Sequence, residues 1–62
     1  MMRLKELRQH KGVTQREVAN AIGCSSQTYA KYERGEREPD LFTLKQLSKY
    51  FGVSIDYILC ND

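Results

Sequence analysis

The segment TQREVANAIGCSSQTYAKYERG, residues 14–35, holds two short helical patterns that are separated by only Gly23 and Cys24. Thr14, with Glu17 three positions later, has the form of a capping box, in which each side chain pairs with the backbone N–H of the other residue. This pattern predicts that the first helix begins directly after Thr14. A link of two residues leaves the chain very few ways to arrange the helices that it joins.

In the first helix of the pair, Val18, Ala19 and Ile22 form one apolar stripe of a 3.6-residue period. Gly23 can adopt the left-handed conformation that ends a helix, and Ser25 is a preferred cap for the next one. So short a link cannot lay the helices antiparallel. It makes them cross steeply and brings the second helix forward on the surface, as in a helix-turn-helix motif. A protruding helix of this kind fits the major groove of DNA.

Three further helical patterns surround this pair. They predict a helix over roughly residues 2–11, a fourth over residues 41–51 after the cap candidate Asp40, and a short fifth that follows Ser54. The apolar residues expected to pack against the pair recur at helical spacing: Leu4, Leu7, Leu41, Leu44, Leu47, Phe51, Ile55, Ile58 and Leu59. Without a strand pattern, repeat or flexible linker, the sequence predicts an all-α bundle of five helices forming one domain over residues 1–62.

The length and composition exclude several classes of protein. A chain of 62 residues buries only about 60% of the surface that it exposes when unfolded, which leaves little room for a large catalytic cavity. The sequence has no Ser/His/Asp or Cys/His arrangement and no phosphate loop, so we expect neither an enzyme nor a cofactor. Cys24 and Cys60 lack metal-ligand spacing and are interpreted as reduced thiols. No apolar run approaches the roughly 20 residues of a membrane span, and the charged start is unlike a signal peptide, so a cytoplasmic protein is expected.

The charge is unevenly distributed along the chain. The net charge is only +2, but residues 1–37 hold eight basic and four acidic side chains, whereas residues 38–62 hold two basic and four acidic ones. The positive half contains the helix pair. This asymmetry favours binding of a polyanion, although a solvated surface without a partner is charged as well.

The second helix of the pair has two faces of different chemistry. Tyr29 and Tyr32 form its apolar side, and the residues on the opposite side are Ser26, Gln27, Ala30, Lys31 and Arg34. A Gln27 amide can pair with adenine in a bidentate way, Lys31 can reach guanine or a phosphate, and the Ala30 methyl suits the thymine methyl. The alternative is an ordinary polar surface, which for Ser26 alone is nearly as good an interpretation.

Other residues are candidates for contact with the DNA backbone. Gln15 lies in the first turn of its helix, where free N–H groups and the helix dipole favour a phosphate. Arg16, Arg34 and Arg37 are further candidates, and each is equally well explained as a solvated charge. His10 has no partner that can be read from the sequence and is assigned to the surface.

The residues from LKELRQHKGVTQREVANAIG to LKQLSKYFGVSIDYIL closely resemble the lambda-repressor/Cro-like (XRE-type) helix-turn-helix family. The TQxExA opening, the ExG followed by a proline, and the LxxLxxxFGVS ending occur in the family's order and spacing. Cys24, Tyr29 and Tyr32 depart from the pattern, because the family usually has aliphatic residues there. These departures bear on core packing rather than on the fold.

The resemblance implies a function and roles for individual residues. It implies that the second and third of five helices bind double-stranded DNA, with Ser26, Gln27 and Lys31 reading bases and Gln15 contacting a phosphate. It also implies a salt bridge between Arg8 and Glu33 that ties the first helix to the third. Family members commonly bind operators as dimers, so we expect a homodimer on a palindromic operator. No membrane partner and no small-molecule site are expected.

Two functions remain open at this stage. One is a sequence-specific transcriptional regulator, most simply a repressor; the other is a protein-interaction or antitoxin-like module that keeps the fold without binding an operator. The polar and basic outer face of residues 26–34 favours the first. The sequence ends just after the fifth helix, which predicts either a minimal regulator or one domain of a longer protein. The resemblance places the dimer contact near Tyr57 or Val53, and a position of Tyr57 in the monomer core is an equally good interpretation.

Overall fold

Five short helices follow one another within residues 2–61, the part of the chain that the computed structural model describes. They are α1 (Leu4–Lys11), α2 (Gln15–Ile22), α3 (Ser26–Arg34), α4 (Leu41–Phe51) and α5 (Ile55–Ile58). The predicted all-α architecture is therefore confirmed, while Met1 and Asp62, the ends of the predicted domain, lie outside the described residues.

Helices α2, α3, α4 and α5 begin where the capping residues predict. Thr14, Ser25, Asp40 and Ser54 each accept a hydrogen bond from the backbone N–H three residues later, at 2.8–3.1 Å. Each of these caps satisfies one of the four N–H groups that a helix start leaves without a partner, and such a cap typically stabilises a helix by about 1 kcal/mol.

The first helix begins later than the sequence predicts, at Leu4 instead of Met2. Its cap, Arg3, makes no capping hydrogen bond with its side chain. The Arg3 backbone N–H donates instead to the Ile58 carbonyl at 2.9 Å, and the guanidinium donates to the Tyr57 carbonyl at 2.7 Å. These long-range bonds hold the start of α1 against α5 and keep Arg3 out of the helix.

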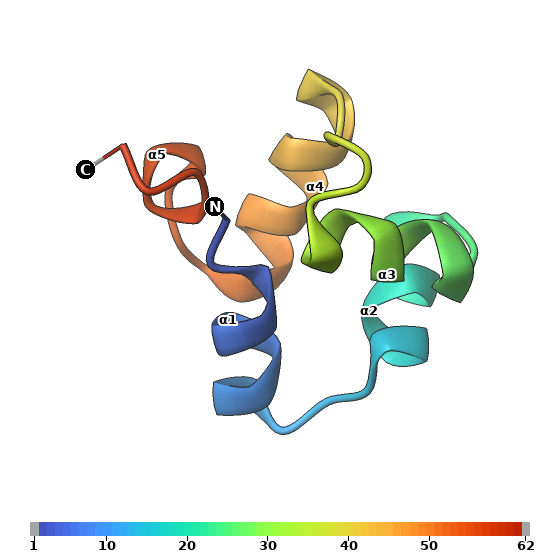
Figure 1. Cartoon of the computed structure of the whole chain (residues 1–62). Coiled ribbons are helices and arrows are strands. Elements are labelled where there is room, and N and C mark those ends of the chain that lie inside the picture. The colour runs from blue at the N-terminus through green and yellow to red at the C-terminus, as the bar shows by residue number, and fades with distance from the viewer. Residues whose placement is uncertain (1, 62) are drawn as a thin grey trace.

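The core lies where the inner faces of the helices meet. Its buried residues among those described are Leu4, Val18, Ala19, Ile22, Tyr29, Tyr32, Leu44, Leu47 and Ile58. Helix α2 packs against α3 and α4, α5 packs against α4, and α1 contacts both α3 and α4. Figure 1 shows α2 and α3 together on one side of the molecule and α1 and α5 on the other, with α4 between them. The helix pair is thus packed against α1 and α4, and α5 packs against α4.

Leu41 is an exception to the predicted core. It lies on the expected apolar stripe of α4, but its residue surface is 62% exposed, and that of its neighbour Phe42 is 67% exposed. The reason is visible in Figure 1, where the first turn of α4 projects beyond the other helices. Leu44 and Leu47, one and two turns further along, are buried. The spacing of apolar residues predicted correctly which face of α4 is apolar. It did not predict how much of that face the other helices cover.

The predicted core of α5 is also only partly correct. Ile58 is fully buried, while Ile55 and Leu59 pack against the core from half-buried positions. A helix of four residues covers too little length to bury three large apolar side chains completely.

Candidate nucleic-acid interface

The turn between α2 and α3 fixes how α3 is presented. Gly23 has φ 79°, the left-handed conformation, and its N–H donates to the Ala19 carbonyl. The Cys24 N–H donates to the same carbonyl at 3.0 Å, and Ser25 then caps α3 at once. A residue with a Cβ atom is strained at such a φ, which explains why the sequence has glycine there. Burial raises the pKa of the half-buried Cys24 thiol, which keeps it protonated.

Helix α3 has one buried and one exposed face. Tyr29 and Tyr32 are 0% and 6% exposed, and their rings meet edge to face at 6.4 Å. The predicted base-reading residues Ser26, Gln27 and Lys31 are exposed, and Ala30 is half-buried at the edge of the same face. The helix that supplies the largest buried side chain of the core therefore also presents polar groups to solvent.

The predicted phosphate contacts have unequal surroundings. Arg16 and Arg37 are exposed, Arg37 in the loop between α3 and α4. Arg34 pairs with Glu36 at 2.5 Å through side chains that are both 53% exposed. Gln15 is half-buried, and its side-chain amide nitrogen donates to Glu33 Oε1 at 3.0 Å. No pattern in the sequence predicts this contact with Glu33, because the two residues lie on different helices, 18 positions apart.

The predicted pair between Arg8 and Glu33 is present. Arg8 Nε lies 2.7 Å from Glu33 Oε2, with the two side chains 16% and 3% exposed, and Arg8 Nη2 lies 3.4 Å from Glu33 Oε1. A third nitrogen of Arg8, Nη1, donates to the Val13 carbonyl at 3.1 Å. The guanidinium therefore connects α1, the loop before α2 and the end of α3, a geometry for which its planar fork of donors is suited.

The electrostatics of this cluster keep both groups charged. The hydrogen bond with Glu33 raises the pKa of the Arg8 guanidinium. Burial by itself raises the pKa of the Glu33 carboxyl, but hydrogen bonds from Arg8 and Gln15 outweigh it, and the net pKa of Glu33 is lowered. Glu33 is therefore an ionised carboxylate at neutral pH despite its burial.

The Tyr29 hydroxyl lies beside the same carboxylate. Burial, followed by the nearby Glu33, raises the pKa of this phenol, so it is protonated at neutral pH. Its oxygen is buried and has no hydrogen bond of ordinary geometry with any other described residue. The sequence predicted that the Tyr29 ring is buried, but it did not predict that the hydroxyl lies beside Glu33.

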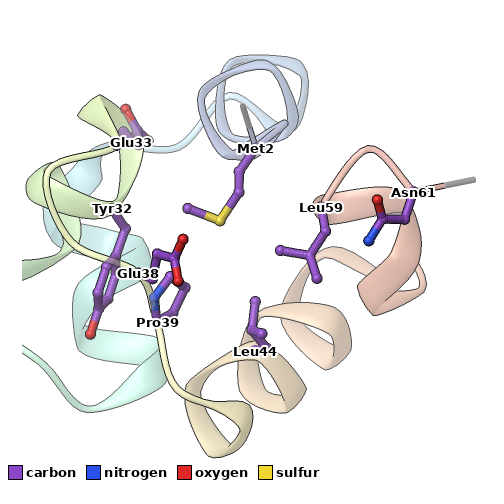
Figure 2. A pocket seen from close by; sticks show the side chains of 9 residues that line it. Met2, Tyr32, Glu33, Glu38, Pro39, Leu44, Leu59 and Asn61 are labelled. Atoms are coloured by element: carbon purple, nitrogen blue, oxygen red, sulfur yellow. The ribbon is translucent and has the colours of Figure 1, made fainter.

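A hollow of about 500 Å³ opens at the C-terminal end of α3. In Figure 2 the side chains of Met2, Leu44 and Leu59 point into a common space, with Glu38 and Asn61 at its edges. Glu33 also lines the hollow, but its carboxylate is bound by Arg8 and Gln15. The hollow includes Leu59 and Asn61 of the C-terminal region, to which the family resemblance assigns the dimer contact.

A family model described as helix-turn-helix matches residues 4–58 of this chain. The chain belongs to the helix-turn-helix family. The match covers every helix of the structure and includes both helices of the pair. The lambda-repressor/Cro-like resemblance seen in the sequence is confirmed, as is the five-helix fold that it implies.

The relatives of this helix-turn-helix chain include regulators and a repressor. It is 49% identical over 57 residues to the SPbeta prophage-derived uncharacterized HTH-type transcriptional regulator YonR of Bacillus subtilis (strain 168), which is 92% of this chain and 53% of YonR. It is 45% identical over 60 residues to the HTH-type transcriptional regulator ImmR of the same organism, 97% of this chain and 47% of ImmR. The chain spans about half the length of the curated relatives that it matches.

The fold is also that of a solved repressor complex. The P22 c2 repressor, crystallised with a synthetic operator, superimposes with a TM-score of 0.91 at 32% sequence identity. The match covers 97% of this chain and 91% of that one. Within residues 2–61, no helix is both long and apolar enough to cross a membrane, and no group of three or more His, Cys, Asp or Glu side chains is placed to hold a metal ion.

The Arg8–Glu33 pair predicts a difference between two carboxylates. Glu33→Gln removes the charge opposite a largely buried Arg8, and we expect it to lower the free energy of unfolding by roughly 3 kcal/mol. Glu36→Gln breaks an exposed pair with Arg34 and is expected to change stability little. Thermal and urea unfolding of both variants measure this difference. Equal melting temperatures would contradict a stabilising role for the buried pair.

The lowered pKa of Glu33 predicts how stability depends on pH. A carboxyl whose pKa is lower in the folded state than in the unfolded state stabilises the fold at pH values above its unfolded pKa of about 4.3. This contribution is lost as pH falls through the folded pKa. The pKa values of Glu36 and Asp40 are lowered too, so the wild-type protein loses stability in acid through all three groups. We therefore expect the stability difference between wild type and Glu33→Gln to shrink from pH 7 to pH 3 in urea titrations. A difference that stays constant would contradict this assignment.

Proposed function

We propose that this chain is a sequence-specific DNA-binding domain of a transcriptional regulator, acting as a repressor, with α3 in the major groove of double-stranded DNA. The observation that carries the proposal is the orientation of α3: its tyrosine face is in the core, and its polar face is exposed. A helix pair joined by so short a turn, with such an exposed face on its second helix, is the arrangement used by DNA-binding helix-turn-helix motifs. The similarity to a repressor crystallised with an operator supports this proposal.

The exposed face of α3 offers the chemistry needed for base readout. We propose that Gln27 pairs with adenine, that Lys31 reaches guanine, and that Ser26 contacts a neighbouring base edge. Ala30, at the edge of the face, presents a methyl group that suits a thymine methyl. These groups project from the outer side of a helix whose inner side is fixed by Tyr29 and Tyr32, so their positions on the DNA would be set by core packing.

Gln15, Arg16, Arg34 and Arg37 would contact phosphates around this helix. Gln15 is the first residue of α2, where unpaired backbone N–H groups attract an anion. Arg16 is the next residue along that helix, and Arg34 and Arg37 flank the end of α3. Arg34 would have to exchange its partner Glu36 for a phosphate, a modest change because the existing pair is exposed to solvent. These contacts would set affinity and register but not sequence preference.

We propose that the domain binds a palindromic operator as a homodimer and acts by binding rather than by catalysis, in the cytoplasm where its DNA target lies. The sequence leaves open whether Tyr57 lies at a dimer contact or in the monomer core. Tyr57 is 38% exposed, and one face of its ring is covered by the Arg3 guanidinium, 4.3 Å from the ring centre. Tyr57 also lines a hollow of about 260 Å³ together with Arg3, Leu7 and His10. This exposed ring supports a contact between protomers in the C-terminal region, where Val53 is half-buried.

A second candidate function is favoured by one observation. Leu41 and Phe42 are large apolar side chains exposed side by side on the first turn of α4. Exposed apolar groups that lie together often mark a protein-binding surface. A module that binds a protein partner through this turn, and no longer binds DNA, is the alternative that a DNA-binding experiment must exclude.

One experiment tests the proposed function directly. Duplexes that bind the protein are selected from a random pool at a stated salt concentration, because affinity for DNA depends strongly on salt. Enrichment of a common sequence supports the regulator, and two inverted copies at a fixed spacing support the dimer. A pool that remains random after repeated selection would favour the protein-binding alternative.

Gln27 and Arg34 are expected to respond differently to substitution. Gln27→Ala should weaken binding to the selected site by about 1–3 kcal/mol and leave binding to random DNA nearly unchanged. Arg34→Ala should weaken both and reduce the salt slope by about 1, because it removes a phosphate contact. Fluorescence anisotropy titrations at several salt concentrations measure both effects. Equal losses on the two DNAs for Gln27→Ala would remove Gln27 from the base-reading set.

The dimer proposal predicts two protomers on one selected duplex. Two α3 helices can enter successive major grooves on one face of the duplex only if their half-sites lie about 34–36 Å apart. Analytical ultracentrifugation is expected to show a monomer or weak dimer in free solution and two protomers per duplex at saturation. One protomer per duplex, with selected sequences that lack symmetry, would overturn the dimer.

A further inference from the structure

The position of Glu33 links the stability of the fold to the DNA contact. We infer that Glu33 is a positioning residue, which holds the Gln15 side-chain amide at the start of α2 in the orientation that contacts a DNA phosphate. This inference rests on the proposed function, since it concerns how that interface is organised. It assigns Glu33 a role in DNA affinity besides its part in the ion pair.

The geometry shows a continuous chain of contacts across three helices. Glu33 on α3 is held by Arg8 of α1 through Nε at 2.7 Å, and its other oxygen, Oε1, accepts from the Gln15 amide at 3.0 Å. The Glu33 side chain is only 3% exposed, so solvent hardly competes for its oxygens. Arg8 also donates to the carbonyl of Val13, directly before the cap Thr14 of α2. The start of α2 is therefore held through both its backbone and its first side chain.

The chemistry of the amide explains why this contact leaves Gln15 able to bind DNA. A glutamine NH₂ group carries two donors, and the bond to Glu33 uses one of them. The second N–H is left for a phosphate oxygen, next to the free backbone N–H groups of the helix start. A side chain that is already ordered loses less conformational entropy when it binds. Holding Gln15 in place would thus strengthen binding without a new protein–DNA contact.

Arg8 explains how a carboxylate can lie behind a phosphate site. An uncompensated negative charge there would repel the DNA backbone, but the guanidinium neutralises it. Tyr29 adds a protonated hydroxyl beside the same carboxylate. The groups from the three helices that surround Glu33 are thus one cation, one amide and one neutral phenol. Glu33 acts here as a neutralised hydrogen-bond acceptor.

A double-mutant cycle between Gln15 and Glu33 tests the inference. The probe is a mixed-sequence duplex of roughly 21 base pairs, about two helical turns, because phosphate contacts do not depend on sequence. Gln15→Ala and Glu33→Ala are each expected to weaken binding about threefold to tenfold, with no further loss in the double variant. Glu33→Ala also frees the positive charge of Arg8, which attracts DNA. This gain in affinity is the same with and without the Gln15 side chain, so it cancels from the coupling energy that the cycle measures.

Two further variants separate positioning from stability. Glu33→Gln keeps an oxygen that can accept from Gln15, so its DNA affinity should not fall below that of wild type, although its melting temperature falls. Glu36→Ala removes an exposed carboxylate near the same helix end, and its effect should add to that of Gln15→Ala. A purely structural role would make affinity follow stability. Affinity of Glu33→Gln that falls as far as that of Glu33→Ala, or additive losses in the cycle, would overturn the positioning role.

NMR on the wild-type protein keeps the inference testable if a Glu33 variant does not fold. On addition of the duplex, one Gln15 side-chain amide proton is expected to keep the chemical shift that reflects its hydrogen bond to Glu33, while the chemical shift of the other amide proton changes. Two unmoved protons, or loss of the bond to Glu33, would overturn the inference with DNA binding intact. If no backbone resonance moves at all, the proposed function fails together with the inference.

Discussion

The bidentate contact between Arg8 and Glu33 is the interaction on which the arrangement of this small protein depends. It is formed between α1 and the last turn of α3 and has its donors and acceptors almost wholly shielded from water. Buried ion pairs contribute little net stability compared with apolar packing, because both charges lose their hydration. We therefore interpret the pair as fixing the orientation of α3 relative to α1, with Gln15 extending the same constraint to α2.

Helix α3 is where the core and the candidate interface meet. Tyr29 is the largest fully buried side chain among the described residues, and it packs edge to face against Tyr32. The exposed residues Gln27 and Lys31 project from the same nine-residue helix. Protein interiors are close-packed, so a change of volume under the tyrosines would shift the helix and with it the groups that are proposed to face the DNA. The packing of Tyr29 and Tyr32 therefore also determines the position of the exposed residues on α3.

Two features of the exposed surface lie at the ends of helices. The first turn of α4 projects beyond the other helices and leaves Leu41 and Phe42 in solvent. The hollow beside Leu59 opens at the C-terminal end of α3 and is lined by residues of α3, of α4 and of the segment after α5. None of the residues Ser26, Gln27, Ala30 and Lys31 lines the hollow, so the hollow is separate from the proposed base-reading residues.

The sequence by itself determined the local structure, because its signals are short-range. The caps Thr14, Ser25 and Asp40, the turn glycine Gly23 and the apolar spacing within each helix act over a few residues, and they defined the five helices and the exposed face of α3. The Arg8–Glu33 pair was predicted only through resemblance to a family. Only the tertiary structure decided how far α4 projects, that Arg3 bonds to α5, and that the Gln15 amide lies on Glu33. Each of these depends on residues distant in sequence, and no spacing along the chain encodes which distant groups will meet.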